Sequence, residues 1–195
     1  MMLKYQSRLI CTLTIFFLSF LTPPAVFSAQ QEYYKKTVEE YQVPDVTLIN
    51  QDGAEVRLKD FLDSDKPILL DFIYGTCTTI CPILSVGFSY FQRQLTIPTQ
   101  SVRMVSITID PDLDTPEVMK EYLTKYNGQP GWDFLTGKRE NITEVLQEFD
   151  AYVSNKMDHF PLTLLKAPGQ NKWIRLYGLL NASDLIAEYD AMMQN

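Results

Sequence analysis

The chain has 195 residues, a net charge of −7 at neutral pH, and apolar residues at 46% of its positions. This acidic balance argues against nucleic acid as a partner, because phosphate binding requires a basic surface. The apolar share indicates a globular protein with a packed interior and excludes a disordered chain.

The N-terminal residues have the pattern of a secretory signal peptide. Lys4 and Arg8 precede an apolar run over residues 9–21, which is short for a membrane span. Val26 and Ser28 suit the positions before a cleavage site. We therefore expect cleavage after Ser28 and export to the periplasm, with an uncleaved N-terminal anchor in the inner membrane as the alternative.

The remainder of the chain is expected to hold one domain. Residues 1–28 are assigned to the leader or anchor, residues 29–42 to a polar spacer for which helix is one alternative, and residues 43–195 to the domain. The length after the leader, roughly 165 residues, suits a single core better than two.

Strands and helices alternate along this domain. The predicted elements are a hairpin over residues 46–49 and 54–58, a buried strand at 68–74, a helix after residue 82, a strand at 102–109, a helix at 115–127, a strand at 132–135, a helix at 139–150, a hairpin at 162–166 and 173–177, and a helix at 182–192. Their order predicts an α/β, thioredoxin-like fold with a central mixed sheet, flanking helices and an N-terminal hairpin. Other α/β domains share this alternation.

Two cysteines follow the buried strand directly. Cys77 and Cys81 precede a predicted helix, so they lie at the carboxyl end of a strand, where open α/β folds place their sites. One helical turn separates their Cα atoms by roughly 6 Å, within reach of a disulfide. The helix dipole is expected to lower the pKa of both thiols. The pair is a redox-active disulfide or two metal ligands, with an inert disulfide or two small buried side chains as the structural alternative. Cys11 lies inside the leader and is set aside.

The single histidine, His159, lies in a loop before a predicted strand. A lone histidine is often a bystander, but a loop at this place can face the neighbouring strand end. With Cys77 and Cys81 it would form a soft set that suits one cuprous ion or, with an added ligand, a cupric ion. A structural zinc site would require four ligands. Asp158 is a candidate to orient the imidazole, and Met157 a candidate to contact a cuprous ion.

Residues 74–82, Tyr-Gly-Thr-Cys-Thr-Thr-Ile-Cys-Pro, resemble the motif of the SCO/SenC family, an aromatic residue followed by T-x-C-x-x-x-C-P. The resemblance extends in order from about Val43 to the C-terminus. It includes residues 106–111 with 114–116, residues 134–137, the pair Asp158–His159, and residues 167–169. Phe160 and Pro161 depart from the family pattern. A proline at this place is similar to the cis-proline that faces the cysteine pair in thioredoxins, which favours thiol-disulfide chemistry.

The resemblance implies a thioredoxin-like, periplasm-facing protein that binds copper through Cys77, Cys81 and His159. It implies a metallochaperone that helps to assemble the dinuclear copper centre of cytochrome c oxidase. The expected partners are the copper-site subunit of the oxidase, or another copper-accepting protein, and a thiol reductant. The alternative function is a thiol-disulfide oxidoreductase, in which Cys77 and Cys81 form the redox-active disulfide.

Overall fold

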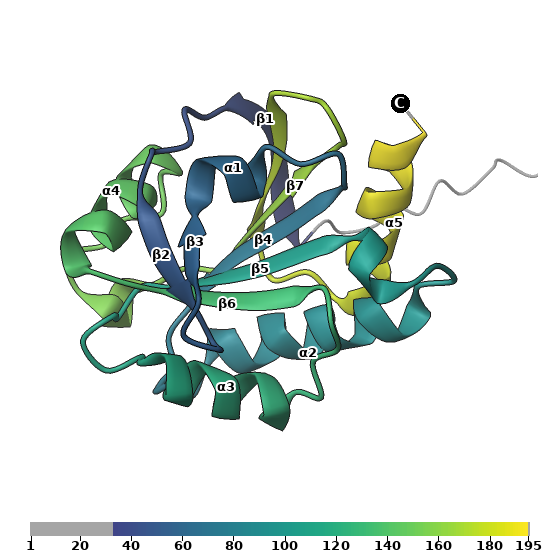
Figure 1. Cartoon of the computed structure of the whole chain (residues 1–195). Coiled ribbons are helices and arrows are strands. Elements are labelled where there is room, and N and C mark those ends of the chain that lie inside the picture. Colours follow the sequence, from purple (N-terminus) through teal and green to yellow (C-terminus); the bar gives the residue numbers. More distant parts are fainter. Residues whose placement is uncertain (1–32, 195) are drawn as a thin grey trace, which may run out of the picture. The chain divides into compact units, whose positions relative to one another are not determined.

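The structure is a computed structural model that describes residues 33–194. Its central feature is a mixed sheet of eight strands. The order of the strands across the sheet is β1-β8-β7-β4-β5-β6-β2-β3 (Figure 1). In chain order the strands are β1 Tyr34–Glu40, β2 Thr47–Asn50, β3 Glu55–Arg57, β4 Ile68–Ile73, β5 Arg103–Thr108, β6 Trp132–Thr136, β7 Leu162–Lys166 and β8 Lys172–Gly178. The helices are α1 Leu58–Leu62, α2 Ile80–Gln94, α3 Pro116–Lys125, α4 Arg139–Glu148 and α5 Ala182–Met193, with short 3-10 helices η1 Thr99–Ser101 and η2 Lys156–Asp158.

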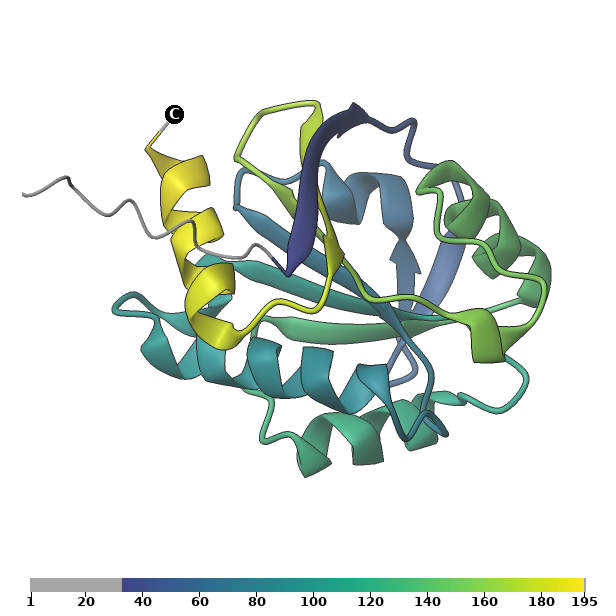
Figure 2. The same ribbon diagram turned by 180° about the vertical axis from the view of Figure 1, so that it is seen from behind.

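The three central strands are parallel, and helices join them. β4 pairs with β5 and β5 with β6 in parallel, whereas the remaining pairs are antiparallel. The connections through α2 and α3 place both helices on one face of the sheet, and α4 lies on the other face (Figures 1 and 2). The right-handed connection preferred between parallel strands accounts for two successive helices on the same side.

Strand β4 leads directly to the two cysteines and is the most deeply placed part of the sheet. All six of its residues are buried, because β5 and β7 cover its edges and helices cover its faces. This agrees with the continuous apolar run predicted to be a strand buried on both sides. A polar residue, Asp71, lies in the middle of this run and is 0% exposed.

The helices largely begin and end where the sequence predicted. The hydroxyl of Thr115 accepts a hydrogen bond from the Val118 amide, and Pro116 occupies the first position of α3. Asn127 has a φ of 54° and so takes the left-handed conformation that ends this helix. α2 begins at Ile80, two residues before Pro82. Cys81 is therefore part of the first turn of α2, and Cys77 lies in the turn before it.

The assignment of the segment before the domain was wrong. Residues 34–40 form strand β1, which pairs antiparallel with β8 over its whole length. No residue of this edge strand is fully buried, so the segment lacks the apolar alternation that marks a strand with one side in the core. Its position is also held by side chains, since the Tyr34 hydroxyl donates to Glu188 at 2.8 Å.

The expected leader, residues 1–28, lies outside the described residues. Within residues 33–194, no helix combines the length and apolar character needed to cross a bilayer.

Candidate metal centre

Cys77 and Cys81 lie at the carboxyl end of β4, as predicted from the sequence. Cys77 is 6% exposed and Cys81 is fully buried. The backbone amide of Cys77 donates to the Tyr74 carbonyl at 3.1 Å, which closes the turn after the strand. Both cysteines are free thiols in this structure. The disulfide between them stays a prediction.

The two thiols have opposite acidity. Burial raises the pKa of Cys77, but hydrogen bonds from the Cys81 thiol, from backbone amides and from the Thr79 hydroxyl outweigh this effect and bring the pKa down to about 7. The Thr79 hydroxyl lies 3.7 Å from the Cys77 sulfur. Burial and the hydrogen bond to Cys77 raise the pKa of Cys81 well above its usual value. The prediction of two acidified thiols is therefore confirmed for Cys77 and wrong for Cys81, because complete burial dominates there.

We expect Cys77 to react with iodoacetamide at a rate that rises through a midpoint near pH 7, because the thiolate is the nucleophile. Cys81 should react far more slowly across the same range. Peptide mapping of the reduced protein by mass spectrometry measures both rates. In a Cys81→Ala variant the Cys77 midpoint should move upward, since the hydrogen bond from the Cys81 thiol is lost. Equal rates at the two cysteines would contradict this asymmetry.

His159 faces Cys81 across the site. Its Nδ1 atom is 3.7 Å from the sulfur of Cys81, although 78 residues separate the two in sequence. Its Nε2 atom is buried and has no hydrogen-bond partner within residues 33–194. Burial lowers the pKa of His159 to about 4, so the imidazole is neutral at pH 7 and keeps a lone pair for a metal ion.

Two aromatic rings hold the imidazole in place. The ring of Tyr74 meets it edge-on with centroids 6.0 Å apart, and the ring of Phe160 stacks beside it at 6.3 Å. Phe160 in turn contacts the ring of Tyr177, at 5.2 Å. Phe160, which departs from the family pattern, thus packs its ring against the imidazole of His159. Pro161 differs from the thioredoxin proline, since no cis peptide occurs in residues 33–194.

No three His, Cys, Asp or Glu side chains of residues 33–194 are placed together closely enough to hold a metal ion as they stand. The structure does bring together Cys81 and His159, and it places Cys77 beside Cys81. Asp158 is exposed, and within the described part of the chain its side chain makes no hydrogen bond to His159. The suggestion that it orients the imidazole therefore has no support in this geometry.

Asp114 positions the turn that carries Cys77. Its buried carboxylate accepts the Gly75 amide at 3.0 and 3.1 Å and also accepts the Thr108 hydroxyl. A Cβ atom on Gly75 would lie 2.8 Å from a carboxylate oxygen of Asp114, which explains the glycine. The sequence indicated only a turn and a helix start around Asp114. Asp114 and Gly75 are 39 residues apart, so the local sequence around either residue did not indicate this contact.

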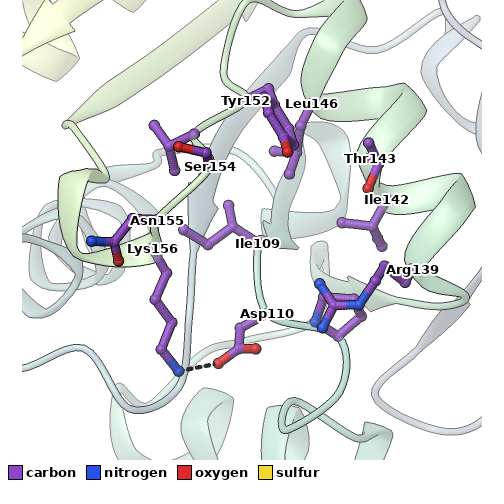
Figure 3. A pocket seen from close by; sticks show the side chains of 12 residues that line it. Ile109, Asp110, Arg139, Ile142, Thr143, Leu146, Tyr152, Ser154, Asn155 and Lys156 are labelled. Atoms are coloured by element: carbon purple, nitrogen blue, oxygen red, sulfur yellow. Dashed lines mark hydrogen bonds and ion pairs between the residues drawn. The ribbon is translucent and has the colours of Figure 1, made fainter.

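The loop before His159 is tied to the end of β5. Lys156 forms an ion pair with Asp110 at 2.5 Å, which Figure 3 shows within a pocket of about 430 Å³. Arg139, on the same pocket wall, pairs with Asp112. The cationic groups of this pocket are thus already neutralised. The Lys156–Asp110 ion pair has a structural role, because it holds in place the segment that carries His159.

Known proteins with similar sequences belong to the family that the cysteine motif resembles. The model of the SCO1/SenC family matches residues 35–192. The SCO1 protein homolog of Bacillus subtilis is 34% identical over 116 residues, a match covering 58% of this chain and 59% of that protein. The chain thus spans about three fifths of the length of this curated relative.

Two solved structures have the same arrangement of sheet and helices. BsSco, described as a Sco-family cytochrome c oxidase assembly protein with a disulfide switch, is 29% identical with a TM-score of 0.64, over 78% of this chain and 94% of that one. Copper-bound ScoI of Bradyrhizobium japonicum is 26% identical with a TM-score of 0.59, over 76% of this chain and 97% of that one. The thioredoxin-like prediction is therefore confirmed. With nearly the whole described domain matched by the family model, the chain belongs to the SCO1/SenC family.

Proposed function

We propose that this protein carries one copper ion on Cys77, Cys81 and His159 and delivers it to the dinuclear copper centre of cytochrome c oxidase. The observation that carries the proposal is the approach of His159 Nδ1 to within 3.7 Å of the Cys81 sulfur. His159 is the only histidine of the chain, and Cys77 and Cys81 are the only two cysteines outside the expected leader.

The donor set suits a cuprous ion. Two thiols and one imidazole are soft or borderline ligands, and three of them satisfy the low coordination number that cuprous ion accepts. The histidine is neutral at pH 7, and the lowered pKa of Cys77, about 7, favours its thiolate. Only Cys81 must lose a proton against its raised pKa. Copper binding should therefore weaken as the pH falls, because protons compete for the sulfur ligands.

The relatives support the same assignment. ScoI of Bradyrhizobium japonicum has been solved with copper bound, and BsSco is described as an oxidase assembly protein. We extend both properties to this chain, with a copper-site subunit of the oxidase as the acceptor. Export through the leader at residues 1–28 would bring the protein to the compartment in which that acceptor site is exposed.

A thiol-disulfide oxidoreductase is the second candidate function. The asymmetry between an acidic Cys77 and a buried, weakly acidic Cys81 favours it, because such a pair provides an attacking and a resolving thiol. The disulfide switch described for BsSco points the same way. A thiol reductant would then be the partner that restores both thiols.

An anaerobic titration tests the copper assignment. The full chain carrying Cys11→Ser, so that Cys77 and Cys81 are its only thiols, is titrated with cuprous ion against a chromophoric chelator. We expect one tight equivalent, lost in both Cys77→Ser and Cys81→Ser. Binding that persists in either variant, together with rapid cycling of a Cys77–Cys81 disulfide, would favour the oxidoreductase.

A further inference from the structure

A thioether lies at the exposed edge of the candidate metal centre. Met157 belongs to the 3-10 helix η2, two residues before His159, and is 72% exposed. Its backbone amide donates to the side-chain oxygen of Asn155 at 3.0 Å, so the backbone is held in place while the side chain extends into solvent. Methionine sulfur is a soft ligand that prefers cuprous ion.

One hydroxyl group connects this thioether to the thiols. The Tyr74 hydroxyl lies 3.9 Å from the sulfur of Met157. The same side chain forms a hydrogen bond with the Cys77 thiol. The ring of Tyr74 also contacts the ring of His159. Tyr74 therefore borders Met157, Cys77 and His159 at the same time.

The two sides of Tyr74 differ greatly in access to solvent. Cys77 is 6% exposed and Cys81 is fully buried, whereas Met157 is open. The Met157 thioether is therefore the soft ligand of this site that is most open to an ion from water or from another protein. The positive charge of Lys156 does not dominate the electrostatics that an approaching copper ion meets. The ammonium group pairs with Asp110 and lies 5.5 Å from the centroid of the Tyr74 ring.

We infer that Met157 is a transient outer ligand, which takes up a cuprous ion and passes it across Tyr74 to Cys77. This inference rests on the proposed copper-carrying function. The step is a ligand exchange without electron transfer. The bond between copper and the Met157 sulfur breaks as a bond to the Cys77 sulfur forms, copper stays cuprous, and the proton of any Cys77 thiol passes to water. Release follows the same path in reverse.

The matched control is a second exposed methionine. Met157 and Met193 are the two exposed methionines of residues 33–194, and Met193 lies at the end of α5 with 45% exposure. Leucine replaces either with little change in volume and no sulfur. Both side chains are exposed, so neither substitution should disturb folding, and circular dichroism can verify this.

The test is a stopped-flow measurement of cuprous ion exchange between a chromophoric chelator and the full chain carrying Cys11→Ser. Met157→Leu should slow uptake and release by about tenfold each, with the equilibrium affinity unchanged, because the ion must then reach a buried thiol directly. Met193→Leu should exchange at the parent rate. Unchanged rates in Met157→Leu would overturn the inference. So would an affinity loss of tenfold or more, which would make Met157 a resident ligand. If the parent chain itself binds no cuprous ion, the proposed function fails and this inference fails with it.

Discussion

Replacing Asp71 with asparagine is expected to favour the folded state of the reduced protein by about 4 kcal/mol more at pH 8 than at pH 4. Asp71 is fully buried in the middle of β4. The Ser106 hydroxyl donates to one of its carboxyl oxygens at 2.5 Å, whereas the other has no hydrogen-bond partner in the described part of the chain. Burial raises the pKa of Asp71 from 3.8 to about 7, and the hydrogen bond from Ser106 only partly opposes this.

The direction of this pH dependence follows from the number of protons that the folded and unfolded states bind. Between pH 3.8 and about 7 the folded protein keeps a proton on Asp71 that the unfolded chain has lost, so stability falls as the pH rises. Above this window both states are ionised and the full cost is present, about 4 kcal/mol for roughly three pH units at 1.36 kcal/mol each. Asparagine cannot ionise. Its amide leaves a buried amino group without a partner, but that cost does not vary with pH.

Urea unfolding of both proteins from pH 4 to pH 8 measures this effect. His159 acts in the opposite direction, because its lowered pKa makes the folded state lose stability as the pH falls from 6.5 toward about 4. The wild-type curve should therefore be flattened in that range, whereas the difference between wild type and Asp71→Asn cancels the contribution of His159. A constant difference from pH 4 to pH 8 would contradict the expectation.

Ser106→Ala provides the matched comparison. Its hydroxyl lowers the pKa of Asp71, so its removal should raise that pKa further and extend the loss of stability to higher pH. Ser106 also accepts the Trp132 indole at 3.0 Å, and that contact contributes a loss that is independent of pH. The two variants should therefore change the slope of stability against pH in opposite directions.

Most of the fold was accessible from the sequence because its elements carry local signals. The buried strand β4 is apolar along nearly its whole length, and Thr115 with Pro116 marks the start of α3. Strand β1 had no such signal. Its residues are polar, and its conformation depends on pairing with β8, which lies more than 130 residues further along the chain. An edge strand of this kind is defined by its partner and not by its own pattern.

The sequence pointed to candidate site residues, but it gave no information on the pKa values of the two thiols. The spacing of Cys77 and Cys81 after a buried strand, together with a single histidine, led to these three side chains, and the fold places His159 beside Cys81 and Cys77 beside Cys81. The divergent acidity of the thiols depends on how deeply each is buried, which spacing does not encode. The contact between Asp114 and the Gly75 amide spans 39 residues, and that between Tyr74 and Met157 spans 83.

His159→Ala is expected to weaken cuprous ion binding by about a hundredfold or more, which corresponds to roughly 2.7 kcal/mol. The variant removes the only nitrogen ligand of the proposed set and leaves two thiols, one of which is difficult to ionise. The measurement is competition against a chromophoric chelator in the full chain carrying Cys11→Ser. Asp158→Asn is the matched control, because Asp158 is adjacent, exposed and not bonded to the imidazole, and it should bind copper as the parent does.

The same variant separates the two candidate functions. A disulfide exchange reaction depends on the Cys77 thiolate, and no hydrogen bond from His159 contributes to the lowered pKa of Cys77. His159→Ala should therefore change the rate of disulfide formation only slightly, by about twofold or less, while it removes tight copper binding. If copper affinity instead stays at the parent value while disulfide exchange slows, His159 serves the thiols and not a metal ion. The oxidoreductase would then be the better account of why the fold places an imidazole against Cys81.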